Sequence, residues 1–423
     1  MLRQITGTVA ARIVITVMGL LVAVIAGHRL GTVGLGAIGL ITLGITLIRL
    51  GTDLLGGGGL VYLVPRVPLG RLLPPCYLGA LVAAALGYGI VRLFHLVPEG
   101  YAPHVALLAF LQGLNAVHLN VLVGQQRIHA NNVVGMAQAM VLVAVFAWLT
   151  GLPGADAHAF ISASYAAVAC ALVLGLLAMR RHAPVLADGP SKVLMLLAGQ
   201  GGYVQAANGM QLMNYRLAYW LIERFRDTAS LGIYTVANQL AEGSWLVPKS
   251  LALVLYSRVS NSRSADGQRL LVLACLKLSM ACALAVIAVL LLLPSCFFQW
   301  AFGPEVVGIT PLIASLAPGI LGMAASQVFS HYFSGTARNV HNVVGSGLGL
   351  AITVVAGLLL IPAYGLQGAA ITATLAYCAN ALYQVVAFMR ITGSSFREMW
   401  PNAADGNRLR ELLIPRRTGG QRQ

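Results

Sequence analysis

The chain has 423 residues, of which 58% are hydrophobic and only 9% are charged. Soluble domains carry about 25% charged residues, so a soluble fold of this length is excluded and the composition favours a membrane protein. The formal net charge of +15 does not indicate nucleic-acid binding, because the basic residues fall in alternate loops between apolar runs.

Apolar runs of about 20 residues or more recur along the chain, and this is the length that an α-helix needs to cross a bilayer. We therefore predict an all-α integral membrane fold with twelve transmembrane helices. The first run is too long for the core of a cleaved signal peptide, so we expect it to remain as a span. The spans are expected near residues 6–28, 34–64, 73–97, 102–124, 131–152, 156–180, 193–222, 228–256, 269–294, 305–334, 340–362 and 366–391.

The distribution of Lys and Arg predicts the orientation of these spans. Basic residues gather in the N-terminal segment, in the loops after helices 2, 4, 6, 8 and 10, and in the tail, whereas the opposite loops hold only Arg29, Arg224 and Arg226. By the positive-inside rule, both termini are expected in the cytoplasm. The basic tail is expected to serve as a topology signal, with binding to anionic membrane lipids as the alternative.

Short matches between the two halves predict an internal repeat. Asn132-Val-Val-Gly recurs from Asn342, an offset of 210 residues, and Thr32-Val-Gly-Leu-Gly aligns with Thr228-Ala-Ser-Leu-Gly, an offset of 196. Each half then has six helices, so the halves share one orientation and are related by a pseudo-two-fold axis along the membrane normal. The predicted parts are an N-terminal bundle (1–182), a cytoplasmic linker (183–192), a C-terminal bundle (193–391) and a basic cytoplasmic tail (392–423).

The second apolar run contains a charge pair that is costly in a bilayer. Arg49 and Asp53 lie four residues apart and share one helical face, which marks them as candidates for a functional site. At the offset of 196, Asp53 corresponds to Lys249, which shares a helical face with Glu242 and Trp245. Because equivalent helices each carry an acid and a base, the repeat predicts two charged faces opposite each other across a central cavity.

The candidate set for this cavity is net positive. It comprises the cations Arg12, Arg49, Arg216 and Lys249, the acids Asp53 and Glu242, and the polar residues Gln211, Asn214, Gln239 and Trp245. Four cations against two acids favour an anionic substrate, which arginine holds with two parallel hydrogen bonds. The structural alternative is that Arg49 and Asp53 only neutralise each other, while Arg12 and Lys249 reach the membrane surface.

Four consecutive glycines, Gly56, Gly57, Gly58 and Gly59, follow the charge pair. Because such a run weakens a helix, we expect a bend or hinge here that serves opening and closing. A nearby Gly34-Leu-Gly-Ala-Ile-Gly pattern matches a dinucleotide-binding fingerprint, but it has no preceding strand, so close helix packing explains it better.

Sequence patterns for catalysis and for metal binding are missing. The chain has no H-E-x-x-H, no P-loop and no nucleophile elbow, and its six cysteines and nine histidines lack ligand spacing. His331, near Gln327 and Ser330, is interpreted as a packed histidine, with a pore-lining role as the alternative. We therefore expect neither an enzyme nor a metal or cofactor site.

Several motifs resemble those of bacterial polysaccharide-export flippases. Arg29-Leu-Gly followed by Gly34-Leu-Gly and Leu50-Gly-Thr-Asp resembles their first two helices, Leu231-Gly-Ile-Tyr-Thr-Val-Ala resembles the start of their eighth, and Leu360-Ile-Pro-Ala-Tyr-Gly-Leu-Gln-Gly resembles the loop between their last two. Their superfamily also contains multidrug and toxin extrusion antiporters and the lipid II flippase. Twelve spans fit the oligosaccharide-lipid branch, since the lipid II flippases have fourteen.

The resemblance implies a V-shaped pair of bundles that alternates access to a cavity lined by helices 1, 2, 7 and 8. It implies a flippase in the bacterial inner membrane that moves undecaprenyl-pyrophosphate-linked oligosaccharide to the outer leaflet for cell-surface polysaccharide synthesis. We expect a monomer that works with polysaccharide assembly proteins, and coupling to H⁺ or Na⁺ stays open. The alternatives are a cation-coupled multidrug exporter of the same superfamily and, more remotely, a membrane glycosyltransferase or polymerase.

Overall fold

The computed structural model describes residues 2–179, 190–246, 248–249, 251–252, 255, 259 and 264–400. All regular elements among them are helices, and residues 183–189 of the predicted linker and 401–423 of the predicted tail lie outside them. The elements are α1 (Leu2–Gly56), α2 (Gly58–Leu63), α3 (Leu69–Leu93), α4 (Ala102–Gly124), α5 (Ile128–Leu149), α6 (His158–Ala178), α7 (Pro190–Phe225), α8 (Thr228–Gly243), α10 (Ala265–Leu292), α11 (Ser295–Phe302), α12 (Ile309–Gly335), α13 (Val340–Tyr364), α14 (Leu366–Thr392) and the 3₁₀ turn η1 (Phe396–Met399).

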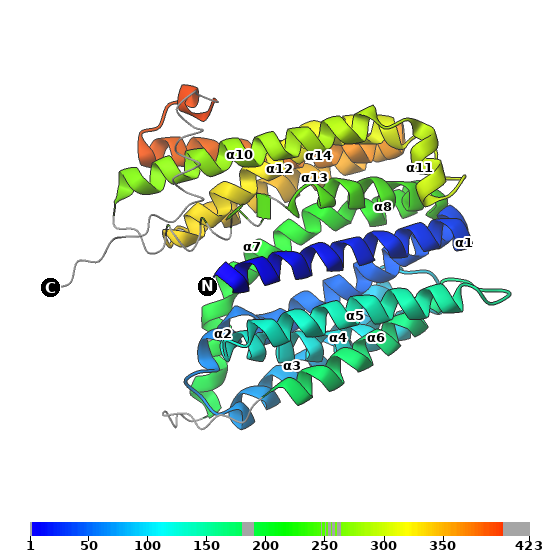
Figure 1. Cartoon of the computed structure of the whole chain (residues 1–423), viewed down its shortest axis with the longest axis horizontal. Coiled ribbons are helices and arrows are strands. Elements are labelled where there is room, and N and C mark those ends of the chain that lie inside the picture. The colour runs from blue at the N-terminus through cyan, green and yellow to red at the C-terminus, as the bar shows by residue number, and fades with distance from the viewer. Residues whose placement is uncertain are drawn as a thin grey trace.

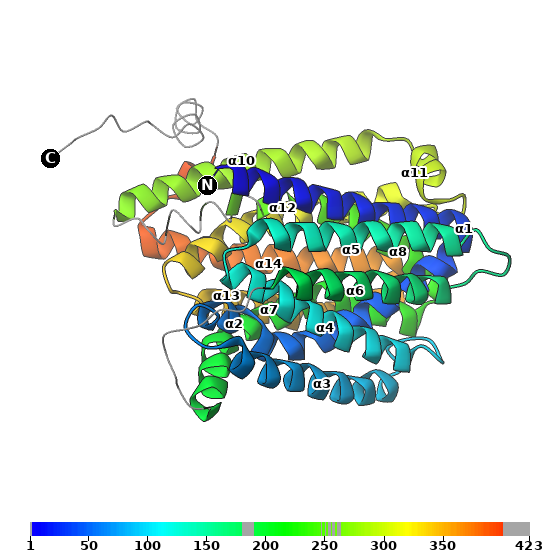
Figure 2. The ribbon, with the colours of Figure 1, turned by 60° about the horizontal axis from the view of Figure 1, so that its bottom comes forward.

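The helices form two groups, with α1, α7 and α8 between them (Figure 1). The N-terminal group contains α3 to α6, and the C-terminal group contains α10, α12, α13 and α14. Helix α1 packs against both α5 and α8, and α7 packs against α1 and α13. The chain begins at the end of the bundle opposite to α11, as both views show (Figures 1 and 2).

The outer surface of the bundle is suited to lipid rather than water. Nine helical segments of the described residues are long and apolar enough to cross a membrane. Large apolar side chains also point outward, among them Leu177, which is 78% exposed, and Leu292, which is 83% exposed. Extensive exposed apolar surface is unfavourable in water but compatible with lipid tails. The fold is therefore that of a multi-pass membrane protein.

Helix α1 changes direction at Gly31. At 1.5 Å per residue its 55 residues would extend about 80 Å, more than twice the hydrocarbon thickness of a bilayer. Gly31 has φ 67° and ψ −168°, a backbone conformation that glycine adopts readily and other residues do not. This kink lies where the sequence predicts the connection between the first two spans.

A second interruption lies in the glycine run. Helix α1 ends at Gly56 and α2 begins at Gly58, with Gly57 between them at φ −89° and ψ −136°. The Gly57 N–H still donates to the Asp53 carbonyl at 3.0 Å, and Asn120 Nδ2 donates to the Gly56 carbonyl at 2.6 Å. The helix is interrupted within the glycine run, and hinge movement at this point remains a prediction.

The two halves of the chain touch through their backbones at the α11 end. A Cβ atom on Gly36 would lie 2.0 Å from the Thr228 carbonyl oxygen, and one on Gly232 would lie 2.0 Å from the Thr32 carbonyl oxygen. Glu305, between α11 and α12, accepts hydrogen bonds of 2.9 Å from both the N–H and the hydroxyl of Thr32. The bundle is thus closed at the α11 end.

The first residues of the predicted tail are docked on the bundle. Arg269, in the first turns of α10, forms an ion pair with Glu398 of η1, with 2.5 Å between Nη2 and Oε2. The described part of the tail therefore belongs to the C-terminal group.

The turn between α13 and α14 gives a prediction on stability. A Cβ atom on Gly368 would lie 2.0 Å from the Leu360 carbonyl oxygen, a backbone atom that cannot move aside cheaply. We expect Gly368→Ala to cost about 1–3 kcal/mol and to lower the melting temperature in detergent. The control is Gly89→Ala in α3, where an added Cβ meets nothing within 4 Å. Equal melting temperatures for the two variants would contradict the packing described.

Closure at the α11 end is expected to depend on pH. Two hydrogen bonds from Thr32 hold the pKa of Glu305 below its ordinary range, because they favour the charged carboxylate. The contact therefore contributes its full stabilisation at pH values above the ordinary pKa of glutamate. This stabilisation is lost as the pH falls through the lowered pKa of Glu305. We expect the α11 ends of the two groups to separate on acidification from about pH 7 to about pH 3.

Spin labels at the exposed positions Leu152 and Tyr364, in a variant without native cysteines, measure that separation. Glu305→Gln should abolish the pH step, whereas Glu99→Gln, at another exposed glutamate, should preserve it. A distance that does not change with pH in the parent protein rules out this role for Glu305.

Candidate functional site: a central cavity with excess positive charge

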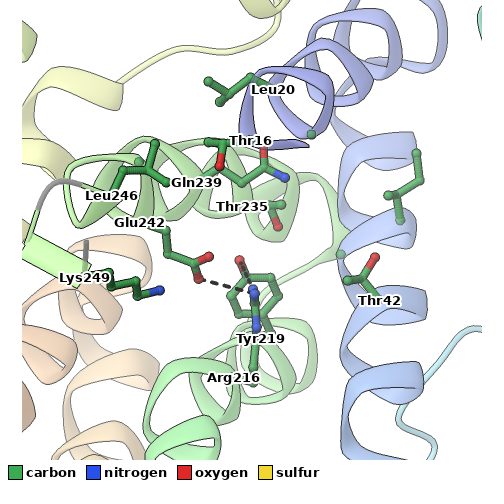
Figure 3. A pocket seen from close by; sticks show the side chains of 14 residues that line it. Thr16, Leu20, Thr42, Arg216, Tyr219, Thr235, Gln239, Glu242, Leu246 and Lys249 are labelled. Carbon is green, nitrogen blue, oxygen red and sulfur yellow. Dashed lines mark hydrogen bonds and ion pairs between the residues drawn. The ribbon is translucent and has the colours of Figure 1, made fainter. Parts of the chain in front are cut away.

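A cavity of about 290 Å³ lies between the two groups of helices. Its walls come from α1 on both sides of the kink, from α7, and from α8 with the residues that follow it (Figure 3). The polar and charged lining residues are Thr16, Thr42, Arg216, Tyr219, Thr235, Gln239, Glu242 and Lys249. Elements far apart in the sequence therefore build one site.

An ion pair between Arg216 of α7 and Glu242 of α8 crosses this cavity. Arg216 Nη2 lies 3.3 Å from Glu242 Oε1, and the two side chains are 19% and 31% exposed. Arg216 Nη1 also donates to the Tyr219 hydroxyl at 2.9 Å, while Asn238 Nδ2 donates to Glu242 Oε1 at 2.8 Å. Arg216 Nε is buried without a partner in the described residues. The pair is thus held in place by Tyr219 and Asn238.

Lys249 adds a second cation to the same space. Its ammonium group lies 5.7 Å from the centre of the Trp245 ring and interacts electrostatically with Glu242, Arg216 and Arg12. Figure 3 shows Lys249 directed toward the space beside Glu242. The described lining therefore holds two cations and one acid, and Arg12, which is exposed, adds positive charge nearby. This balance suits an anionic group.

Arg49 and Asp53 lie apart from this cavity. Neither residue lines the central cavity or either of two further cavities in the C-terminal group. Asp53 interacts electrostatically with Arg49, but no ion pair in direct contact joins them in the described part of the chain, and Arg49 Nε is buried without a partner there. The residues that the repeat relates therefore differ in placement, since Lys249 lines the cavity and Asp53 does not.

The four polar candidates are also divided. Gln239 lines the central cavity, and Gln211 lines two cavities farther into the C-terminal group. Asn214 is 4% exposed, donates to the Ser346 carbonyl at 3.1 Å and accepts from the Thr353 hydroxyl at 3.2 Å, so it joins α7 to α13. Trp245 is 1% exposed and packs edge-on against a tyrosine ring. Asn214 and Trp245 thus serve packing.

Two residues that orient the ion pair were not among the sequence candidates. Tyr219 follows Arg216 by three positions, and Asn238 precedes Glu242 by four, so both share a helical face with a charged residue. Asn238 Nδ2 also donates to the Tyr219 hydroxyl at 3.3 Å, which links the two sides of the pair. The spacing is a signal in the sequence that identifies both.

No family model matches the chain, and no curated protein matches its sequence. Its fold matches solved structures of transporters. The lipid II flippase MurJ in an inward closed conformation is 12% identical, with 98% of this chain and 93% of that chain covered and a TM-score of 0.72. A multidrug resistance MATE family transporter of the MOP superfamily, in its inward-facing conformation, is 13% identical, with 90% and 94% covered and a TM-score of 0.69.

A third match is the MATE multidrug transporter DinF-BH. It is 15% identical, with 94% of this chain and 95% of that chain covered and a TM-score of 0.68. Identities this low establish the fold alone. The chain therefore shares its all-helical membrane fold with these transporters and this flippase.

The ion pair gives a prediction on stability that separates charge from packing. Removing one partner by Glu242→Ala leaves the largely buried Arg216 side chain without its carboxylate, which should cost about 1–3 kcal/mol. Replacing both partners, by Arg216→Met with Glu242→Leu, should recover most of that loss, because the buried guanidinium is removed together with its carboxylate partner. Melting temperatures in detergent measure all three proteins. A double variant no more stable than Glu242→Ala would contradict the pairing.

Proposed function

We propose that this protein is a flippase that moves undecaprenyl-pyrophosphate-linked oligosaccharide from the cytoplasmic to the outer leaflet of a bacterial inner membrane, for cell-surface polysaccharide biosynthesis. The observation that carries the proposal is the central cavity, where Arg216 and Lys249 face the single acid Glu242. Guanidinium and ammonium groups bind pyrophosphate oxygens through charge-assisted hydrogen bonds. The match in fold to a lipid II flippase adds support.

The closed α11 end supports an alternating-access cycle. With both termini in the cytoplasm, the α11 end faces outward, and the glycan and pyrophosphate enter the cavity from the cytoplasmic side while the lipid tail stays in the bilayer. A membrane potential that is negative inside assists export of an anion by roughly 2.3 kcal/mol per charge per 100 mV. Bending at Gly57 and opening of the Glu305–Thr32 contact then accompany release to the outer side.

We propose for the same protein twelve spans in two six-helix bundles, 1–182 and 193–391, related by a pseudo-two-fold axis. Reciprocal contacts support this symmetry. Gly36 contacts Thr228, and Gly232 contacts Thr32. Gly232 lies 196 positions after Gly36, and Thr228 lies 196 positions after Thr32, so the two contacts are equivalent under the repeat. A Cβ atom on Gly39 would lie 2.8 Å from the Thr235 hydroxyl, and these two positions also differ by 196. Contacts between equivalent positions are expected on a two-fold axis.

A second candidate function is export of small organic cations coupled to H⁺ or Na⁺. It is favoured by one observation, the Glu242 carboxylate, which is 31% exposed in the cavity. An organic cation would compete with Arg216 for this carboxylate and would meet the charge of Lys249, and both effects weaken its binding. The fold matches to multidrug transporters support this candidate as well. In either case we propose a monomer. For the flippase, we propose that it works with polysaccharide assembly proteins.

Translocation by purified protein in proteoliposomes tests the proposal. A lipid-linked glycan should become accessible to an added hydrolase at a rate that depends on the protein. Lys249→Ala should reduce this rate about tenfold, equivalent to one lost ionic contact of about 1.4 kcal/mol. The matched control is Arg92→Ala, an exposed cation of α3 outside the cavity, which should leave the rate unchanged.

Two results would argue against the flippase. One is wild-type protein that does not accelerate crossing of the glycan. The other is gradient-driven uptake of an organic cation dye that depends on Glu242 while the glycan is ignored, which would identify the multidrug exporter instead.

A further inference from the structure

A recess within the C-terminal group adjoins the central cavity. Its larger chamber has a volume of about 390 Å³, within the range of roughly 300–1,000 Å³ that is typical of small-molecule sites. Its smaller chamber has a volume of about 60 Å³, room for about four to six waters or one small substituent. Four residues line both chambers, so we treat them as one polar recess: Asn208, Gln211, Ser330 and Ser334.

The smaller chamber is polar and uncharged. All ten described residues that line it are serine, asparagine or glutamine, contributed by α7, α12, α13, α14 and the turn before α13. A cluster of amides and hydroxyls in a membrane bundle is costly unless its hydrogen bonds are satisfied. With neither an acid nor a base in this lining, the chamber suits a neutral ligand rich in hydrogen-bonding groups.

Two amide side chains of this chamber donate hydrogen bonds, while their carbonyl oxygens accept none. Asn380 Nδ2 donates to the Ser326 hydroxyl at 3.1 Å, and Gln384 Nε2 donates to Asn342 Oδ1 at 3.3 Å. The carbonyl oxygens Asn380 Oδ1 and Gln384 Oε1 are buried and have no partner in the described part of the chain. The two side chains are 3% and 1% exposed. These two acceptors are therefore left for donors of a ligand, which the hydroxyl and acetamido N–H groups of a sugar supply.

Lys249 connects this recess to the central cavity. It lines both the central cavity and the larger chamber, where Gln327 and His331 are its neighbours. An anionic group held by Lys249 and Arg216 would thus have its next covalent unit at the entrance of the recess. The unpaired acceptors of Asn380 and Gln384 repel anions. The charged part of a ligand therefore binds in the central cavity and its neutral part in the polar recess.

We infer that the polar recess binds the neutral sugar unit joined to the pyrophosphate, with its hydroxyl or N–H groups donating to Asn380 and Gln384. This inference rests on the proposed flippase function and assigns a substrate class to one part of it. The recess makes the protein bind the glycosylated carrier more tightly than the bare lipid pyrophosphate. A ligand without the sugar leaves the two acceptors unpaired or bonded only to water. The empty carrier is then a poor substrate for export.

Competition binding to the purified full-length protein in detergent tests this inference. The two probes are a short-chain polyprenyl pyrophosphate and the same lipid bearing a neutral disaccharide. Wild-type protein should bind the glycosylated probe about tenfold more tightly, as expected for one or two additional hydrogen bonds to buried acceptors. Gln384→Leu and Asn380→Leu should abolish this preference and leave the affinity for the bare probe unchanged.

Two further variants keep the test independent of folding. Ser330→Ala removes only a hydroxyl that lines both chambers, and it should reduce the preference by severalfold in a protein of normal melting temperature. Asn115→Leu changes a matched buried amide in the N-terminal group, 4% exposed and bonded to Gln138, and should leave the preference unchanged.

The outcomes separate the inference from the proposed function. Bare and glycosylated probes that bind wild-type protein equally well overturn the inference alone. A preference that survives in both Gln384→Leu and Ser330→Ala overturns it too, as does a recess that binds Na⁺ while sugar has no effect. If neither probe binds, the flippase function and the inference fall together.

Discussion

The tightest constraint in this molecule is the backbone contact between Gly36 and Thr228 and between Gly232 and Thr32. The atoms that a Cβ would strike are carbonyl oxygens of the backbone, so a change of rotamer cannot relieve the clash. Glycine at both positions lets the two halves of the chain meet at the α11 end. With that end joined, a cavity remains between the halves. Its polar walls come from side chains of α1, α7, α8 and the residues that follow α8.

The charge arrangement in that cavity follows from the cost of isolated charge in a low dielectric. Arg216 and Glu242 offset each other, and Tyr219 and Asn238 fix their geometry. The net charge then resides on Lys249, which has the ring of Trp245 beside it and Arg12 nearby. An anion entering this cavity meets Lys249 and the guanidinium of Arg216. It must also compete with Glu242 for the guanidinium, which makes binding of the substrate and the charge state of Glu242 interdependent.

The sequence predicts the helices and part of the site, and the rest depends on how helices face each other. Hydropathy places the spans, and a glycine run predicts the interruption at Gly57. Helical spacing predicts Glu242 and Lys249 as site residues, and Arg216 and Gln239 are further candidates as polar or charged residues of membrane helices. These four residues line one cavity. Helical spacing does not predict how each helix is rotated toward its neighbours. Added Cβ atoms at Gly51 and Gly87 would touch Ala83 and Ile48, so close packing against α3 sets the rotation of this half of α1, and periodicity does not encode it.

Neutral polar residues escape sequence reasoning for a related reason. Of the amides in the smaller chamber, only Gln211 is among the sequence candidates. The amides come from three helices and a turn, and none carries a charge that stands out in an apolar segment. Yet such groups discriminate ligands better than charges do. A cation attracts every anion, whereas a buried acceptor without a donor costs about 1–3 kcal/mol and is satisfied only by a correctly placed hydroxyl or N–H group. A transporter that must bind tightly enough to select, and weakly enough to release, gains from dividing these tasks between Lys249 and the recess beside it.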